Sequence, residues 1–253
     1  DSLRHWDRST ASRVTHFIAI SETIRDRIAR CYGRESRVIT PPVNTDFYHP
    51  SPTSQPREDF YLVVSALVPY KRIEQAVLAC ERLNRRLIVI GEGTERGRIE
   101  AMAGPNTTFL GWRSDEEIRD HYRRCRALLF PGEEDFGIVP VEAIACGAPV
   151  IALGRGGVAE SIDASAGRTY PESTVDSLAD ALREWERQGF PHDPAMARRR
   201  AEQFSLPAYR ERMLRMLAEV AFGQGRAGGL VPPAPHVDIT RTRPALHDDP
   251  RRS

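Results

Sequence analysis

From about residue 60 onward, short apolar runs alternate with segments whose apolar residues recur at helical spacing. Several of these runs lack polar alternation, which is typical of strands that are covered on both faces. The pattern predicts an α/β fold with a doubly wound parallel sheet. The expected strands are residues 61–67, 86–90, 107–110, 128–130, 148–153 and a last short strand that closes at Tyr170; the expected helices are residues 71–83, 94–103, 115–126, 140–146, a short one around Glu160, 175–188, 194–203 and 207–222.

The first part of the chain carries a shorter version of this alternation. Residues 16–20 and 37–40 predict strands, and Ser21 can cap a helix between them. The pair Pro41-Pro42 then forces an extended connection. We therefore expect a hinge from about Pro41 to about Asp59.

The two ends of the sequence differ from the rest. Residues 223–253 are rich in Gly, Pro, Arg and Asp and have no apolar periodicity, which predicts a disordered tail. The sequence starts without an initiator methionine, which indicates a fragment. We interpret residues 1–42 as the remnant of an N-terminal domain with its hinge, and residues 43–222 as the main domain.

Charge and composition exclude several classes of protein. With 36 Lys and Arg against 35 Asp and Glu, the net charge of +1 provides no field that would attract nucleic acid. No run approaches the roughly 18 apolar residues that span a bilayer, and the start has no signal-peptide core, so we expect a soluble protein. The 4 cysteines show no paired spacing, which favours free thiols and hence the reducing cytoplasm.

An acidic turn and the helix after it carry the main candidate site. Glu134 lies in the turn and Glu142 in the first turns of the helix, with seven residues between them. Both carboxylates can face the crevice at the carboxyl end of the strands, where open α/β sheets bind ligands. Free amides at Phe136, Gly137 and Ile138 favour an anion beside them, and a carboxylate suits a sugar diol. The combination predicts a ligand with hydroxyls and phosphates, although acidic residues near a helix start also occur simply as partners of the helix dipole.

Two further loops follow strands of the main domain. Lys71 could reach a diphosphate from the crevice, where a cation offsets leaving-group charge; the alternative is a solvated lysine, whose charge is unfavourable near a helix start. Gly91-Glu92-Gly93 partly matches the Gly-x-Gly-x-x-Gly fingerprint of dinucleotide-binding proteins. However, the third glycine is displaced by one residue, and the next strand ends without the acidic residue that would bind a ribose. The alternative for this segment is a tight turn without a ligand.

The sequence offers no metal site. None of the 7 histidines forms a pair at metal-ligand spacing, and Glu133-Glu134-Asp135 lacks the Asp-x-Asp arrangement that holds a divalent ion. Neither a Gly-x-Ser-x-Gly elbow nor a P-loop lysine occurs, so hydrolase and kinase interpretations have no support. We expect neither a metal nor a cofactor.

The acidic segment also carries a family resemblance. The span from Glu134 to Glu142, followed by Ala-x-Ala-Cys-Gly-x-Pro-Val-Ile, resembles the Glu-x7-Glu motif of retaining GT-B glycosyltransferases of family four. The resemblance covers about residues 14–222 and identifies the main domain with the nucleotide-sugar-binding, Rossmann-like C-terminal domain of that family. It implies that Glu134 contacts the donor sugar and that Glu142 contacts the nucleotide ribose.

The resemblance assigns roles to the other loops as well. The loop at Lys71 is similar to the family's Gly-Arg-Leu-x-Pro-x-Lys, whose Arg and Lys bind the diphosphate. The arginine position is Ala66 here, so either Arg72 takes over the second cationic contact or the diphosphate is held by one cation fewer. The turn with Gly91 and Gly93 resembles the nucleotide-binding loop, where backbone contacts lie near the base.

By resemblance, the chain is the donor-binding half of a retaining, metal-independent enzyme that transfers a hexose from a nucleotide-diphosphate sugar to a glycan or lipid-linked acceptor. Residues 67–72 and 130–138 look most like bacterial mannosyltransferases of polysaccharide assembly, so GDP-mannose is the expected donor. We expect the protein in the cytoplasm, in contact with the inner face of the membrane through the N-terminal domain that this chain lacks. Two alternatives stay open: a nucleotide-sugar-binding module without turnover, and a GT-B sugar-nucleotide epimerase.

Overall fold

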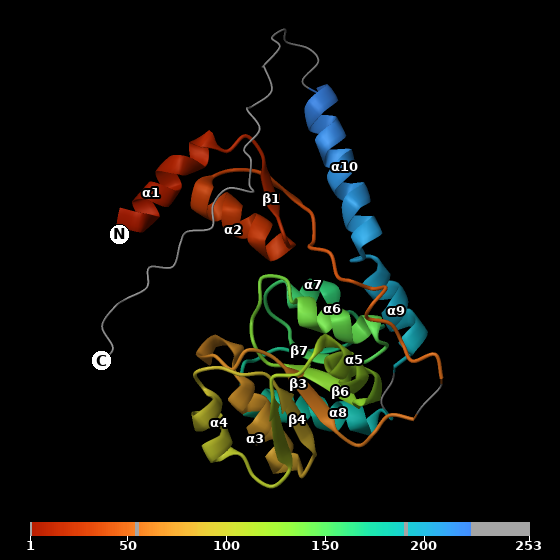
Figure 1. The fold of residues 1–253 in the computed structure, drawn as a ribbon. Coiled ribbons are helices and arrows are strands. Elements are labelled where there is room, and N and C mark those ends of the chain that lie inside the picture. Colours follow the sequence, from red (N-terminus) through yellow and green to blue (C-terminus); the bar gives the residue numbers. More distant parts are fainter. Residues whose placement is uncertain (1, 54–55, 190–191, 224–253) are drawn as a thin grey trace, which may run out of the picture. The chain divides into compact units, whose positions relative to one another are not determined.

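Six parallel strands form the sheet around which the main domain is arranged (Figure 1). The computed structural model describes residues 2–53, 56–189 and 192–223. The strands lie side by side in the order β5, β4, β3, β6, β7 and β8. Their bounds are β3 Tyr61–Val64, β4 Leu87–Ile90, β5 Thr107–Gly111, β6 Ala127–Phe130, β7 Val150–Leu153 and β8 Gly167–Tyr170.

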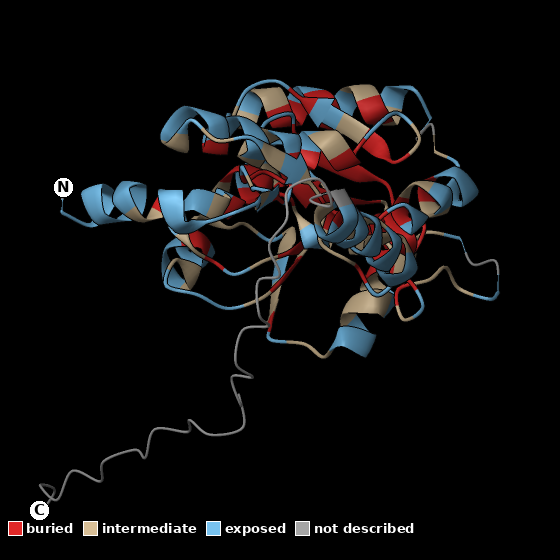
Figure 2. Ribbon diagram, turned by 90° about the horizontal axis from the view of Figure 1, so that it is seen from above, coloured by how far each residue is buried: buried red, intermediate tan, exposed pale blue. Residues whose placement is uncertain are grey.

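Helices cover both faces of this sheet. Successive side chains of a strand point to opposite faces, so β3 sends Leu62 and Val64 into one core and Tyr61 and Val63 into the other. Buried residues are accordingly concentrated in the strands and on the helix sides that face them (Figure 2). The first core is covered by α5 (Asp115–Arg124), α6 (Ile138–Ala145), α7 (Val158–Ser161) and α9 (Pro194–Glu202), and the second by α3 (Ile73–Leu83), α4 (Arg96–Met102) and α8 (Val175–Arg187).

The direction of winding reverses between β3 and β6. These two strands pair in parallel although three helices and two strands separate them along the chain. The loops that follow them therefore leave the same edge of the sheet, and open sheets bind ligands at such a switch point. The predicted doubly wound α/β fold is confirmed, and Lys71 and Glu134 lie on the two neighbouring loops.

The helix predicted over residues 71–83 is divided. Pro69–Lys71 form a short 3-10 turn (η2), Arg72 takes a left-handed φ of 54°, and α3 begins only at Ile73. Proline favours a first helical position, and here it starts the separate turn. Lys71 consequently lies in the loop after β3 and not inside α3.

The N-terminal segment has its own small sheet, in which β1 (Phe17–Ala19) pairs in parallel with β2 (Ser36–Val38). The helix between them, α2 (Glu22–Tyr32), begins as predicted, because the Ser21 side chain accepts a hydrogen bond from the Ile24 amide. The sequence predicted no element before residue 16, whereas the structure contains α1 (Ser2–Thr10) and a 3-10 turn, η1 (Ala11–Arg13).

The segment between β2 and β3 is anchored to the main domain. Val43 and Tyr48 are buried in the first core, and Arg198 of α9 donates to the carbonyl oxygens of Thr45 and Tyr48, each at 2.7 Å. The domain boundary between residues 42 and 43 and the hinge up to Asp59 stay predictions.

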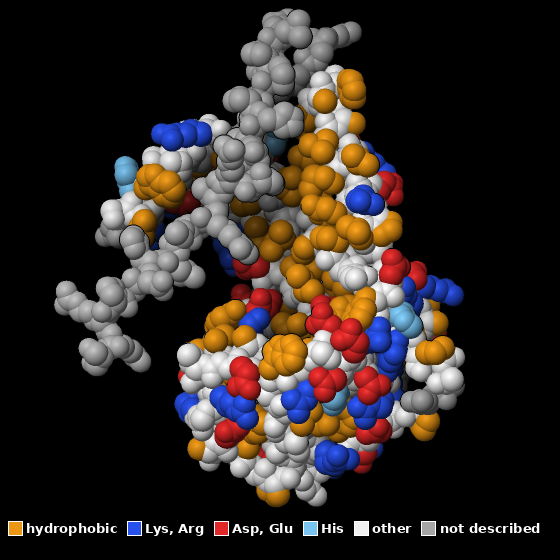
Figure 3. All heavy atoms as spheres, in the orientation of Figure 1, with side chains coloured by type: hydrophobic (Ala, Val, Ile, Leu, Met, Phe, Trp, Pro, Cys, Tyr) orange, Lys and Arg blue, Asp and Glu red, His pale blue; other side chains and the backbone are white. Residues whose placement is uncertain are grey.

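Two compact units divide the chain at Arg215 and Met216, within α10 (Leu206–Gly223). The disordered tail predicted over residues 223–253 lies, beyond Gly223, outside the described residues. Among the residues described, none of the helices has the length and apolar character needed to cross a membrane. On the face of the main domain that Figure 3 presents, basic and acidic side chains are interspersed, in keeping with the net charge of +1.

Candidate functional site

A cavity of about 330 Å³, the switch-point cavity, opens at the carboxyl ends of β3 and β6. The loops after these two strands and the first residues of α6 form most of its wall, and Ile20 and Pro41 of the N-terminal segment complete it. Of the predicted site residues, the cavity brings together Lys71, Glu134, Phe136, Gly137 and Ile138.

Lys71 and Glu134 form an ion pair across the switch point. Their side chains are only 17% and 21% exposed, so the pair is largely shielded from water. The Lys71 ammonium also lies 5.2 Å from the ring centre of Tyr70 and 5.9 Å from that of Phe130. These contacts fix the positive charge at the cavity before any ligand binds.

Close backbone approaches hold the acidic turn in place. A Cβ added at Gly132 would lie 3.0 Å from the Lys71 Cα, so the two loops at the switch point touch. On the other side, the Gly157 amide donates to the Glu134 carbonyl oxygen at 2.7 Å, and a Cβ at Gly156 would collide with that same oxygen. The glycine-rich turn after β7 therefore lies directly against the acidic turn.

The start of α6 has no side-chain cap. Its N-cap, Gly137, has a left-handed φ of 88°, and a Cβ there would lie 2.6 Å from the Val158 side chain. Phe136 beside it is buried and packs edge-on against Phe204, in the turn after α9, with ring centres 5.5 Å apart. The first amides of a helix lack acceptors within the helix, so those at Ile138 and after can bind an anion.

Glu142 has surroundings different from those of Glu134. It is not among the residues that line the cavity, and its Oε2 accepts a hydrogen bond from the buried Tyr122 hydroxyl at 3.2 Å. Burial raises the pKa of Glu142 from 4.5 to about 7, against the opposing effect of Tyr122. Because residues four apart share a helix face, Glu142 lies one turn beyond Ile138, which lines the cavity. A ligand that touches both carboxylates must extend along this face of α6.

The remaining predicted contacts lie outside the lining of the cavity. The Arg72 guanidinium is 3.9 Å from the Glu74 carboxylate, and its side chain is 56% exposed. Gly91 and Gly93 have a structural explanation, because a Cβ at either position would collide with the backbone of the loop after β3, at Ser65 and Leu67. The nucleotide contacts assigned to these three residues stay predictions.

Sequence reasoning missed two contributors to the site. Gly132 was given no role, because that role depends on a contact with a loop about sixty residues away, for which the sequence gives no signal. Tyr122 was assigned to a helix with no further role, although its position one helical turn after Ile118 indicated burial.

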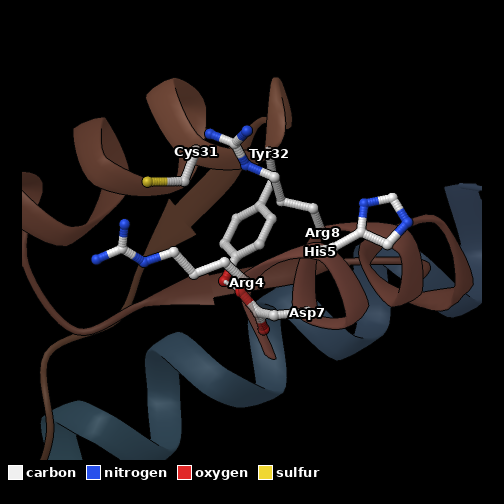
Figure 4. Close-up of a pocket in the computed structure, with 6 residues that line it drawn as sticks. All are labelled: Arg4, His5, Asp7, Arg8, Cys31 and Tyr32. Atoms are coloured by element: carbon white, nitrogen blue, oxygen red, sulfur yellow. Dashed lines mark hydrogen bonds between the residues drawn. The ribbon is translucent and has the colours of Figure 1, made fainter. Parts of the chain in front are cut away.

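A further cavity, of about 550 Å³, lies between α1 and α2 (Figure 4). The Tyr32 hydroxyl donates to the Asp7 carboxylate there at 2.7 Å, and the α1 side chains around it are exposed. None of the predicted site residues lies in it. Its lining residues are Arg4, His5, Asp7, Arg8, Cys31 and Tyr32. Within residues 2–53, 56–189 and 192–223, no group of 3 or more His, Cys, Asp or Glu side chains could hold a metal ion.

The sequence profile of the family described as "Glycosyl transferases group 1" matches residues 44–204, which is more than half of the 253 residues. The chain belongs to this glycosyltransferase family. The matched region contains all six strands of the main sheet and both loops that line the switch-point cavity. Of the residues that line this cavity, only Ile20 and Pro41 lie outside the matched region.

Individual glycosyltransferases resemble the chain at modest sequence identity. It is 28% identical over 195 residues to the GDP-mannose-dependent alpha-(1-6)-phosphatidylinositol monomannoside mannosyltransferase of Mycobacterium tuberculosis, covering 65% of this chain and 51% of that protein. It is 28% identical over 154 residues to the O-antigen chain mannosyltransferase RfbU of Salmonella typhimurium, covering 57% and 43% respectively. The chain thus spans about half the length of the curated relatives it matches.

The fold agrees with solved glycosyltransferases. The structure of Anabaena HepE in complex with UDP and glucose matches with a TM-score of 0.70 and 22% identity, covering 85% of this chain and 66% of that one. At this identity the likeness establishes the fold alone. The GT-B type of glycosyltransferase fold that the sequence predicted is therefore confirmed.

Proposed function

We propose that this chain is the donor-binding half of a retaining, metal-independent glycosyltransferase that uses a nucleotide-diphosphate sugar. The observation that carries the proposal is the Lys71–Glu134 ion pair beside the uncapped start of α6, in one cavity at the switch point of the sheet. A cation and free amides attract phosphate, whereas a carboxylate accepts hydrogen bonds from sugar hydroxyls. The cavity therefore offers groups for both halves of such a donor.

Around the sugar, the proposed roles follow the lining of the cavity. Glu134 and the amides of Phe136, Gly137 and Ile138 orient the hexose. Negative charge grows on the diphosphate as the glycosyl bond breaks, and the Lys71 ammonium offsets it. Because Lys71 pairs with Glu134 in the free chain, an incoming diphosphate takes over part of that pairing and leaves carboxylate oxygen available for the sugar.

Around the nucleotide, Glu142 accepts hydrogen bonds from the ribose hydroxyls at the margin of the cavity. Arg72 is proposed as the second cation for the diphosphate in place of the family arginine, and Gly91 and Gly93 as backbone neighbours of the base. For Arg72 this requires its side chain, which is 56% exposed, to leave the Glu74 carboxylate, to which it is held only loosely at 3.9 Å.

The proposed donor is GDP-mannose and the proposed acceptor a glycan or lipid-linked sugar. Support comes from the two relatives above, both named as mannosyltransferases and one as GDP-mannose-dependent. The chain spans about half the length of these relatives, so donor binding and transfer are tested separately. Binding without transfer by this chain would match the alternative of a binding module.

A calorimetric panel of GDP-, UDP- and ADP-sugars against the chain tests donor binding. We expect GDP-mannose to bind most tightly, and Glu142→Ala to weaken its binding by roughly 1.5–3 kcal/mol, because a charge-assisted hydrogen bond is lost. Glu172→Ala is the matched control, since Glu172 is an exposed carboxylate away from the cavity. Failure of every nucleotide sugar to bind would overturn the proposal, and equal affinity of the Glu142 variant would remove the ribose assignment.

A further inference from the structure

Glu142 is held by aromatic side chains from two other parts of the chain. Tyr122 of α5 is fully buried and donates its hydroxyl proton to Oε2 of Glu142 at 3.2 Å. Tyr48, from the segment between β2 and β3, is 7% exposed and packs edge-on against Tyr122 with ring centres 6.0 Å apart. The two rings thus form a wall behind the carboxylate.

The position of Tyr48 is itself fixed from a third element. Arg198 of α9 donates to the carbonyl oxygens of Thr45 and Tyr48, and the Val43 amide donates to the Phe204 carbonyl oxygen at 2.8 Å. The Tyr48 ring also packs edge-on against Phe47, at 4.9 Å. A segment expected to act as a hinge therefore supplies a fixed residue next to the proposed ribose site.

We propose that Tyr122 and Tyr48 are positioning residues for Glu142: Tyr122 holds its Oε2, Tyr48 packs against Tyr122, and Oε1 is left to accept from a ligand diol. The inference rests on the proposed function, because it takes Glu142 as the ribose contact. A buried carboxylate without a donor rotates more freely and takes up a proton more readily, and the Tyr122 hydroxyl opposes both by hydrogen bonding to the charged form.

One consequence is a pH dependence of donor binding. The pKa of Glu142 is raised to about 7: burial and the nearby charge of Asp115 raise it, and the phenol groups of Tyr122 and Tyr48 partly offset this. A protonated carboxyl group accepts fewer hydrogen bonds, so donor affinity increases as the pH rises through about 7. The titratable groups that face Glu142 are Tyr122 and Asp115 from α5, Tyr48 from the segment before β3, and Cys146 at the end of α6.

The test compares Tyr122→Phe with a matched control. Tyr61→Phe also removes a buried hydroxyl that donates to a carboxylate, that of Glu186 at 2.9 Å, but in the other core. Calorimetry with GDP-mannose is carried out across about pH 5.5–8.5. Each phosphate of this donor has one ester and one anhydride linkage and keeps a single negative charge, so the diphosphate charge does not change there. In parallel, carboxyl-carbon NMR of the ligand-free chain, labelled at glutamate, follows the titration of Glu142 directly.

We expect Tyr122→Phe to move the midpoints of both titrations upward by about 0.5–1 pH unit, because one hydrogen bond to the charged form is lost. Tyr61→Phe should leave both midpoints unchanged, and Tyr48→Phe should move them upward by less. An unchanged Glu142 titration in Tyr122→Phe would overturn the positioning role, whatever the nucleotide binding shows. If no nucleotide sugar binds, the proposed function fails, and a shifted NMR titration still supports the positioning of Glu142.

Discussion

Replacing Glu142 by glutamine should stabilise the chain in a pH-dependent way. The pKa of this carboxyl group is raised by burial from 4.5 to about 7 in the folded chain. Glutamine keeps the shape and an oxygen that can accept from Tyr122, but it has no charge to bury. The difference in unfolding free energy between the two chains therefore reports the free-energy cost of the buried charge.

The size and sign of this difference follow from proton binding. Between pH 4.5 and about 7 the folded chain keeps a proton that the unfolded chain has released, so the stability of the wild type falls as the pH rises. At about 1.4 kcal/mol for each pH unit, the cost reaches roughly 3 kcal/mol above neutrality. Glu142→Gln avoids this cost, and below pH 4.5 the two chains should have similar stability.

Urea unfolding followed by tryptophan fluorescence at about pH 5 and about pH 8 measures the difference. We expect Glu142→Gln to be more stable than the wild type by roughly 3 kcal/mol at the higher pH and by less than 1 kcal/mol at the lower. Glu172→Gln, at an exposed position, should show no such change. An equal difference at both pH values, or a less stable variant at the higher pH, would refute the reasoning.

Three further predictions concern the loops and helix ends. Lys71→Met should weaken GDP-mannose binding by roughly 1.5–3 kcal/mol in calorimetry, and unchanged affinity would remove Lys71 from the diphosphate site. Gly156→Ala should destabilise the chain by roughly 1–3 kcal/mol in urea unfolding, because its φ is 70° and its Cβ would collide with the Glu134 carbonyl oxygen; equal stability would mean that the turn is not held there. Ser114→Ala should cost about 1 kcal/mol, since Ser114 and Glu117 form a capping box at the start of α5, and no loss would contradict that contribution.

Many strands and helices of the main domain could be predicted from the local sequence. Uninterrupted apolar runs predicted the strands, and the helix predicted from residue 115 begins there as α5, where Ser114 and Glu117 form a capping box. The helix predicted near Pro140 begins at Ile138, two residues earlier. These features depend on residues within one or two helical turns of each other, so the sequence alone determines them.

Features that depend on contacts between residues far apart in the sequence could not be predicted. The turn at Gly156 forms a bridge with Glu134, which is more than twenty residues earlier in the chain. Glycines permit a close backbone approach, but they do not indicate which segment is approached. For the same reason, the sequence placed Glu142 at the crevice without showing that Tyr122 lies behind it.

The division of the helix at Arg72 has a different cause. The apolar spacing of Ile73, Val77 and Cys80 fits one helix, and nothing in that spacing excludes an earlier start. The left-handed φ of Arg72 places Lys71 in a separate turn, where it pairs with Glu134. A single backbone angle thus decides whether the lysine reaches the site.

Amide NMR of the chain during titration with GDP-mannose tests most directly whether the switch-point cavity binds a nucleotide-diphosphate sugar. We predict that the largest shift changes fall on the amides of Phe136, Gly137 and Ile138, with further changes at Lys71, and that they saturate together. Shift changes confined to residues around Tyr32, or none on saturation with the ligand, would contradict the proposed donor site.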